Sequence, residues 1–242
     1  MTKRAVPREA RIPDRMRIYA IGDVHGRDDL LERMLAKIDE DLAAHPIERA
    51  IQVFLGDYVD RGPSSRGVVS RLFDRAHSHE TVFLLGNHEV MFSQFLEAPE
   101  ILGHWQQLGG LDTLMSYGVE VPHKIAPAQF ADLSAAIFKA MPASHRSFLN
   151  QLVPWFSCGS YFFVHAGVRP GVALEAQRQQ DLCWIREEFL NHEGDFGKII
   201  VHGHTPVPEP EIWPNRINID TGAYATGRLT CLILEGSKSW FL

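Results

Sequence analysis

Metal-binding residue types recur along the chain, and most of them follow directly on an apolar stretch that ends at a glycine. These residues are Asp23, His25, Asp57, Asn87, His165 and His204. They offer oxygen and imidazole nitrogen atoms but no thiolate, a donor set that suits Mn, Fe or Zn better than Cu(I) or an iron–sulfur cluster. Six donors exceed the need of one tetrahedral ion, so they favour two ions that share a carboxylate. Two such ions, about 3.5–4 Å apart, can clamp a phosphate and activate water.

The apolar stretches before these donors are predicted strands that bring them to one place. Segments 16–22, 51–55 and 81–85 are short and apolar, and each is closed by a glycine. An amphipathic helix is predicted over 28–44, and a second helix, capped by Ser64 or Ser65, is predicted to run to about residue 77. A β-α-β-α-β order predicts an α/β fold that begins with parallel strands. Because ligands gather at the carboxyl ends of such strands, we expect the donors to share one rim.

Further strands are predicted in the second half of the chain, at 160–165, 198–201, 217–219 and 229–234. Two of them end at histidines, which adds imidazole donors to the same rim. The stretch between the two halves has no strand pattern and reads as helices joined by loops.

The domain organisation follows from these patterns. Residues 1–15 are basic and contain two prolines, so we predict a flexible basic arm. Residues 16–242 are predicted to form a single domain, with a helical cap or insertion over about 90–155.

Five short motifs occur in one order along the chain. They are Gly-Asp-Val-His-Gly at 22–26, Gly-Asp-Tyr-Val-Asp-Arg-Gly at 56–62, Gly-Asn-His-Glu at 86–89, His-Ala-Gly at 165–167 and Gly-His-Thr at 203–205. Together they resemble the motifs of calcineurin-like metallophosphoesterases, and more narrowly those of bacterial and lambda-phage phosphoprotein phosphatases. One motif alone would be weak, whereas five in order are specific. The resemblance implies a four-layer α/β/β/α sandwich with two central mixed sheets and a helical insertion.

The resemblance also implies a dinuclear metal centre. The first ion would be held by Asp23, His25 and Asp57, and the second by Asp57 together with Asn87, His165 and His204. Manganese is the expected metal, with iron or zinc as alternatives.

Roles in catalysis follow from the same resemblance. A metal-bridging hydroxide would attack phosphorus, and His88 would protonate the leaving oxygen while Asp60 holds its imidazole. Arg61, Asn87 and Arg186 would contact the substrate phosphate. For Arg186 the matching motif is short, so an ion pair on a helix surface is a real alternative.

The substrate is less well defined by the sequence. The last motif lacks the second histidine of many nucleases, and the intact Asp60 with Glu89 favours a serine/threonine protein phosphatase. The main expectation is therefore hydrolysis of a phosphorylated protein or a small phosphoester. The first alternative is a hydrolase of dinucleoside polyphosphates or of RNA 5′ ends. The second is a non-catalytic phosphate-binding module.

Composition excludes several classes of protein. The 242 residues carry a net charge of -6, so stable nucleic-acid binding is not expected. Three widely spaced cysteines form no disulfide framework or cysteine-rich zinc site. No apolar run is long enough to span a membrane, and no secretory signal is recognisable, so we expect a cytoplasmic protein. The oligomeric state is left open.

Overall fold

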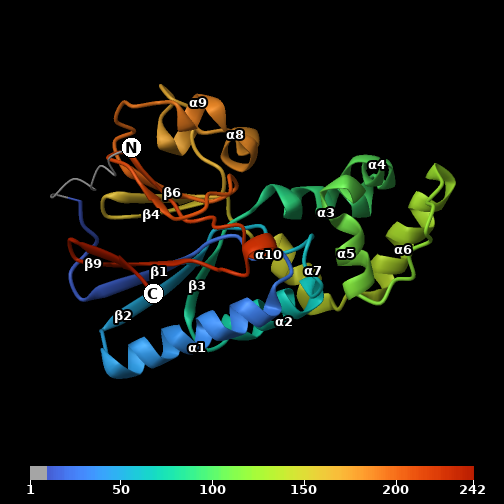
Figure 1. Ribbon diagram of the computed structural model, residues 1–242, viewed down its shortest axis with the longest axis horizontal. Helices are drawn as coiled ribbons and strands as arrows, with labels where there is room; N and C mark the ends of the chain where they lie inside the picture. The colour runs from blue at the N-terminus through green and yellow to red at the C-terminus, as the bar shows by residue number, and fades with distance from the viewer. Residues whose placement is uncertain (1–9) are drawn as a thin grey trace.

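The computed structural model describes residues 10–242, which form two five-stranded sheets packed face to face (Figure 1). The first sheet has the order β10 (Lys238–Phe241), β9 (Cys231–Glu235), β1 (Met16–Ile21), β2 (Arg49–Phe54) and β3 (Glu80–Phe83). The second has the order β4 (Trp155–Cys158), β5 (Tyr161–Val164), β6 (Ile199–His202), β8 (Arg216–Asn218) and β7 (Glu211–Ile212).

Both sheets are mixed. Strands β1, β2 and β3 are parallel, with Ile18 beside Ile51 and Phe54 beside Phe83, and β9 and β10 add antiparallel pairs at one edge. In the second sheet β5, β6 and β8 are parallel, while β4 and β7 pair antiparallel at the two edges. The parallel strands in the middle of each sheet therefore point their carboxyl ends toward a common rim.

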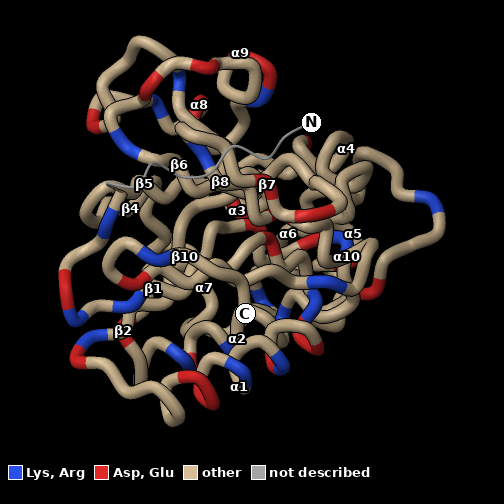
Figure 2. The backbone as a smooth tube through the Cα atoms, turned by 60° about the vertical axis from the view of Figure 1, so that its left-hand side comes forward, with Lys and Arg blue, Asp and Glu red and all other residues tan. Residues whose placement is uncertain are grey.

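Helices cover the outer face of each sheet. Those nearest the sheets are α1 (Asp28–Ala44), α2 (Ser65–Arg75), α8 (Gln179–Trp184) and α9 (Glu187–Leu190). In Figure 1, α1 and α2 lie outside the first sheet, and α8 and α9 lie outside the second. The apolar face of α1 is buried through Leu31, Leu35 and Ile38. Figure 2 shows residues of both charge signs along its outer side.

The core is divided by the sheets into layers. Between the sheets, Ile18 and Val53 pack in one cluster with Phe163 and Val201. A separate cluster joins the outer face of the second sheet to α8 and α9. Successive side chains of a strand point to opposite faces of the sheet, so they pack in two different clusters. These layers confirm the predicted α/β/β/α sandwich.

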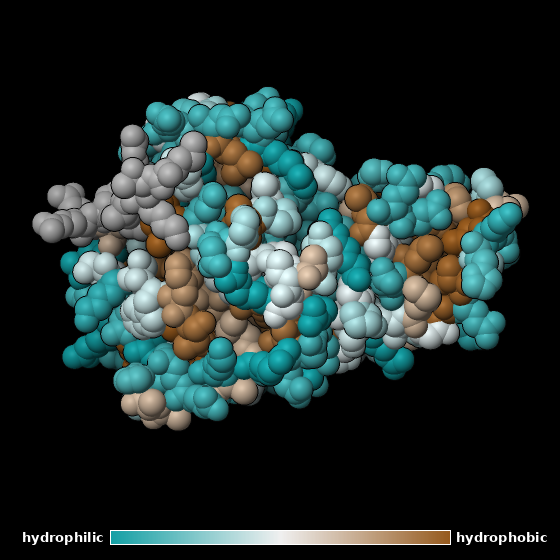
Figure 3. All heavy atoms as spheres, in the orientation of Figure 1, coloured by the Kyte–Doolittle hydropathy of each residue, from teal (hydrophilic) through white to brown (hydrophobic). Residues whose placement is uncertain are grey.

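A run of helices extends sideways from the sandwich (Figure 1). It contains α3 (Asn87–Glu97), η1 (Pro99–Ile101), α4 (Leu102–Trp105), η2 (Gln106–Leu108), α5 (Gly110–Ser116), η3 (Pro127–Gln129), α6 (Phe130–Ala140) and α7 (Ala143–Asn150). We call the residues that follow α3, 98–150, the helical insertion. Figure 3 shows hydrophobic surface on the outer part of this insertion. Phe138, which lies on α6, is 55% exposed. Two short helical segments lie elsewhere, η4 (Leu174–Ala176) and α10 (Ala223–Thr226).

The predicted flexible arm, residues 1–15, needs a correction. Residues 1–9 lie outside the described residues. Ala10 and Ile12 are buried in the cluster between the sheets, and the Ile12 N–H donates a hydrogen bond of 3.0 Å to the Gly236 carbonyl. The prediction is wrong for residues 10–12, because an apolar side chain there fills the space between the sheets.

None of the described helices is both long and apolar enough to span a membrane.

Three strands went unpredicted, namely β4, β7 and β10. Two of them belong to hairpins whose turns contain Gly159 and Gly236, each with a φ of 54°. These edge strands are short and mostly half-exposed, so their apolar pattern is weak.

Candidate active site

The predicted metal-binding residues meet at the carboxyl ends of the parallel strands. They follow β1, β2, β3, β5 and β6, and all six are buried: Asp23, His25, Asp57, Asn87, His165 and His204. Ligands gather at the carboxyl ends of parallel strands, a relation that we call the strand-end rule. Here it brings together residues that lie up to 181 positions apart in the sequence.

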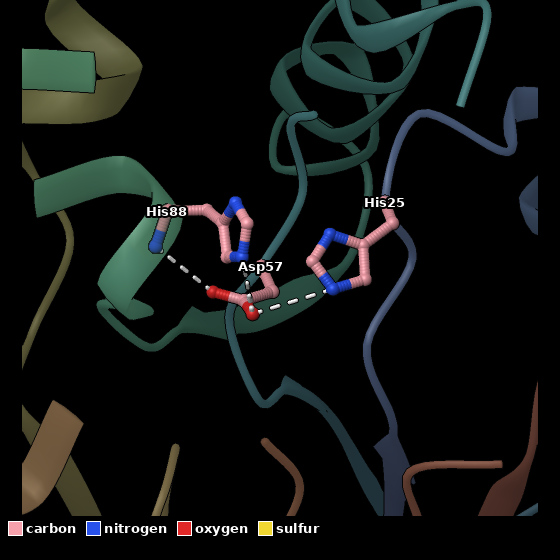
Figure 4. A group of neighbouring side chains, drawn as sticks. All are labelled: His25, Asp57 and His88. Atoms are coloured by element: carbon pink, nitrogen blue, oxygen red, sulfur yellow. Dashed lines mark hydrogen bonds and ion pairs between the residues drawn. The ribbon is translucent and has the colours of Figure 1, made fainter. Parts of the chain in front are cut away.

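Asp57 lies between two groups of donors. His25, Asp57 and His88 form one group, and Asp57, His165 and His204 form the other, with the ligand atoms of each group within 4.8 Å of one another. The Asp57 Oδ2 atom is 3.4 Å from His25 Nε2, whereas Oδ1 is 3.3 Å from His165 Nε2. Figure 4 shows the Asp57 carboxylate between His25 and His88. One carboxylate thus presents each oxygen to a different group, as a bridging ligand would.

Asn87 completes the second group. Its Oδ1 atom is 2.9 Å from His165 Nε2 and 2.9 Å from His204 Nδ1. As the first residue of α3, Asn87 is placed by the helix that starts where β3 ends. An amide oxygen, two imidazoles and a carboxylate oxygen therefore converge on one point.

The imidazole orientations fit a metal centre. His25 Nδ1 donates to the Val59 carbonyl at 3.0 Å, and His165 Nδ1 donates to the Leu55 carbonyl at 2.9 Å, with the protons assigned from these acceptors. Each ring therefore turns an unprotonated Nε2 toward Asp57. Histidine ligands in metalloproteins are held in the same way, through the nitrogen that does not bind the ion.

The surroundings of Asp23 also suit a bound metal ion. Its Oδ2 accepts the His204 N–H at 3.0 Å, whereas its Oδ1 is buried without a hydrogen-bond partner among the described residues. Burial and then the charges of Asp220 and Asp57 raise the pKa of Asp23 well above its usual value. A divalent cation would supply the missing positive charge. Asp23 belongs to neither of the two compact groups, however.

The protonation states also suit metal binding. Burial lowers the pKa of His25 to about 3 and that of His204 to about 2, and it lowers the pKa of His165 as well. For Asp57, burial favours the neutral acid, but attraction to the surrounding histidines outweighs it and lowers the pKa. Neutral imidazoles around an ionised carboxylate are the form that binds a cation.

Glu89 holds the loop that carries Asp57. Its Oε2 accepts the N–H groups of Asp57 at 2.8 Å and Gly86 at 3.2 Å. Its Oε1 accepts those of Tyr58 at 2.7 Å and Val59 at 3.2 Å. The side chain therefore fixes the backbone on both sides of the shared carboxylate, a role that the sequence left undecided.

His88 and Asp60 form the predicted pair. His88 Nδ1 donates to Asp60 Oδ2 at 2.6 Å, and both side chains are buried. Burial opposes charge on the imidazole, but Asp57 and then Asp60 raise the pKa of His88 above its usual value. The His88 Nε2 atom lies 3.8 Å from Asp57 Oδ2, so this imidazole faces the donor groups.

Both predicted arginines lie at the rim. Arg61 Nη1 donates to His25 Nε2 at 2.8 Å, and its guanidinium carbon is 4.7 Å from the centre of the Tyr224 ring. Arg186 Nε donates to His204 Nε2 at 3.0 Å. The contact with His204 favours the phosphate-binding interpretation of Arg186 over an ion pair on a helix surface.

Four residues beside the site were not predicted. Asp220 follows β8, so the strand-end rule could have found it. Tyr224 lies on α10, while Trp105 and Thr113 contact Asp60 from the helical insertion. No local pattern marks these three, because their contacts depend on the tertiary fold.

A two-sheet sandwich with oxygen and imidazole donors at its strand ends defines a metal-dependent hydrolase. The family described as calcineurin-like phosphoesterase matches residues 16–231. The chain belongs to that family, which implies a dinuclear divalent metal site and a phosphoesterase activity.

Curated relatives cover nearly the whole chain. A protein of Anoxybacillus flavithermus named "Bis(5'-nucleosyl)-tetraphosphatase PrpE [asymmetrical]" is 28% identical over 236 residues, which span 88% of each chain. A protein of Bacillus thuringiensis with the same name is 27% identical over 239 residues, 90% of each chain. These names do not specify a serine/threonine phosphatase, which was the narrower expectation.

Solved structures share the fold. A crystal structure described as a "putative diadenosine tetraphosphatase" has a TM-score of 0.62 at 21% identity and covers 100% of this chain and 98% of its own. A mutant cold-active protein tyrosine phosphatase has a TM-score of 0.60 at 16% identity, covering 99% and 82%. At these identities the likeness concerns the fold alone.

Proposed function

We propose that this phosphoesterase hydrolyses dinucleoside polyphosphates, which was the first alternative from the sequence. The observation that carries the proposal is similarity over 88–90% of both chains to proteins named bis(5'-nucleosyl)-tetraphosphatases. The match spans the rim and the helical insertion alike, so it is not limited to metal-binding motifs. A phosphoanhydride substrate also suits a rim with two arginines.

Six residues would hold two divalent ions, with manganese as the proposed metal. They are Asp23, His25, Asp57, Asn87, His165 and His204. Bound there, the ions would polarise the phosphoryl group and make water a better nucleophile.

The remaining site residues would orient the substrate and move a proton. Arg61 and Arg186 would donate to phosphoryl oxygens in place of their present contacts with His25 and His204, since a guanidinium binds two oxygens at once. His88 would deliver the proton on Nε2 to the leaving oxygen, while its Nδ1–H stays bonded to Asp60. Asn87 would contact the phosphate from the start of α3.

A second candidate is hydrolysis of phosphoserine or phosphothreonine in proteins. The buried bond of 2.6 Å between His88 and Asp60 favours it, because a proton donor matters most when the leaving group is a poorly stabilised alkoxide. A nucleoside phosphate is a better leaving group and needs that proton less.

The test compares the two substrates with one preparation. Metal-stripped protein is reloaded with manganese and given diadenosine tetraphosphate or a phosphothreonine peptide. Faster cleavage of the dinucleotide, into one nucleoside triphosphate and one monophosphate, is the expected result. Faster release of phosphate from the peptide would instead favour the second candidate, hydrolysis of phosphoserine or phosphothreonine in proteins. Absence of turnover on both would favour a phosphate-binding module.

A further inference from the structure

We propose that the helical insertion positions the proton donor, through Trp105 and Thr113 acting on Asp60. The inference rests on the proposed role of His88 as proton donor. Trp105 ends α4 and Thr113 lies in α5, so both belong to a region that carries none of the family motifs. Each is fully buried.

Three donors converge on the Asp60 carboxylate. Its Oδ2 accepts from His88 Nδ1 at 2.6 Å and from Trp105 Nε1 at 2.6 Å. Its Oδ1 accepts from Thr113 Oγ1 at 2.6 Å. An indole N–H can only donate and an ionised carboxylate can only accept, so the direction of the Trp105 bond is fixed. With both oxygens engaged, the carboxylate cannot rotate away from His88 without losing a buried bond.

Thr113 also holds the backbone of Asp60. The Asp60 N–H lies 2.9 Å from Thr113 Oγ1 and 3.0 Å from Ser65 Oγ. Asp60 has a φ of 72°, in the left-handed region that residues other than glycine seldom adopt. One hydroxyl therefore contacts the backbone and the side chain of the same residue, and it supports a conformation that the chain would not choose unaided.

Trp105 is itself fixed by the helix that carries His88. Its ring stacks on Phe92, with centroids 5.5 Å apart and planes at 16°, and packs at 5.0 Å against Phe95. Both phenylalanines lie on α3, which begins at Asn87. On another side, a Cβ at Gly110 would come within 2.3 Å of the indole ring. The contacts form a closed path from α3 through Trp105 and Asp60 back to His88.

The same segment also contacts the neighbouring arginine. The Arg61 N–H donates to the Gly109 carbonyl at 3.3 Å, and a Cβ at Gly109 would lie 2.5 Å from the Arg61 nitrogen. Gly109 has a φ of 96°, which only glycine adopts freely. Residues 105–113 therefore contact both Asp60 and Arg61. The Asp60 side chain orients the proton donor His88, and the Arg61 side chain contacts His25.

The kinetic test uses Thr113→Val, which keeps the shape of the side chain but removes the hydroxyl. Manganese-loaded protein is assayed with phenyl phosphate, a poor leaving group, and 4-nitrophenyl phosphate, whose leaving group needs little protonation. We expect kcat on phenyl phosphate to fall about 10-fold, the size of one hydrogen bond to a charged group. The fall on 4-nitrophenyl phosphate should be smaller, and KM should not change.

Three further variants make the test specific. Thr113→Ser restores the hydroxyl and should recover most of kcat, whereas Trp105→Phe should resemble Thr113→Val. Ser134→Ala removes a different buried hydrogen bond of the insertion, from Ser134 Oγ to the Phe95 carbonyl, and should leave the ratio of the two substrates unchanged. Equal losses on both substrates, or equal effects of Thr113→Val and Thr113→Ser, would overturn the proposal.

A spectroscopic readout separates this proposal from the proposed function. The His88 Nδ1 proton, bonded to a buried carboxylate, should give a downfield proton resonance that exchanges slowly with water. That resonance should persist in Thr113→Ser and be lost or shifted in Thr113→Val, even if the wild-type protein hydrolyses none of the substrates tried. An unchanged resonance in Thr113→Val would contradict the positioning role, whatever the activity.

Discussion

The strand-end rim and the helical insertion contribute to one site in different ways. The rim supplies the six predicted metal-binding residues, and each of them follows the end of a strand by four residues or fewer. The insertion supplies Trp105 and Thr113, which touch neither donor group directly but bind Asp60. Reactive groups and their nearest supports, such as Asp60 and Glu89, lie in short motifs, whereas the residues that hold Asp60 from behind come from a region without motifs.

The two regions also differ in how their polar groups are satisfied. At the rim, Asp23 keeps an oxygen without a partner among the described residues, and acids and imidazoles crowd together. In the insertion, His145 is hydrogen-bonded at both ring nitrogens, to Tyr117 and Ser70. Changes at the rim should therefore reduce activity most, and changes in the insertion should reduce stability or orientation.

Replacing the shared carboxylate should have the largest effect. Asp57→Asn keeps the shape of the side chain but removes the charge that faces both donor groups. We expect turnover to fall by more than about 10²-fold, as for the loss of a group that stabilises the transition state. The bound manganese, measured by atomic absorption, should fall as well. The exposed Asp195→Asn serves as control and should behave like the wild-type protein.

Removing the proton donor should have a large but substrate-dependent effect. His88→Asn should lower kcat on a poor leaving group by about 10²–10⁴-fold, the usual contribution of a general acid. The loss on 4-nitrophenyl phosphate should be much smaller, and bound metal should be retained. If both substrates lose equally, His88 acts on the donor groups rather than on the leaving oxygen.

The arginine–tyrosine contact should matter less. Tyr224 is 39% exposed and lies under the Arg61 guanidinium, so Tyr224→Leu removes a contact that contributes about 0.5–1 kcal/mol at an exposed site. We expect KM to rise about 2–5-fold with little change in kcat. Trp240→Leu, at a side chain of similar exposure on β10, is the matched control. An unchanged KM in Tyr224→Leu would show that Arg61 needs no support from the ring.

The smallest effect should be one on stability in the insertion. Burial lowers the pKa of His145, whose folded-state value therefore lies below the unfolded value of about 6.5. Its contribution is complete above that unfolded value and is lost as the pH falls toward the folded one. His145→Gln should cost about 1 kcal/mol of unfolding free energy at pH 7.5 and less at pH 5, measured by urea unfolding. A loss of unfolding free energy that is larger at pH 5 than at pH 7.5 would contradict the lowered pKa of His145.

Much of the rim could be predicted from the sequence, because its geometry is a consequence of strand order. Buried parallel strands leave a strong local pattern, and a donor placed directly after such a strand reaches the common edge. Asp220 obeys the same rule after β8 and was overlooked because it lies outside the motifs.

The contacts of Trp105 and Thr113 with Asp60 could not be predicted from the sequence. Trp105 lies 45 residues from Asp60 and Thr113 lies 53 residues away, and a helical pattern does not say which residue a side chain will touch. The packing of Ile12 between the sheets escaped prediction for the same reason. The sequence placed a phosphoprotein first and a dinucleoside polyphosphate second, and the proposed function reverses that order on the names of the relatives. The Asp60–His88 pair bears on proton transfer and does not identify the group that leaves.

The most direct test of the two-group site is anomalous diffraction from crystals grown with manganese. Two peaks are expected beside the Asp57 carboxylate, one on the side of His25 and one on the side of His165. A single peak, or two peaks that do not share Asp57, would contradict the two-group site.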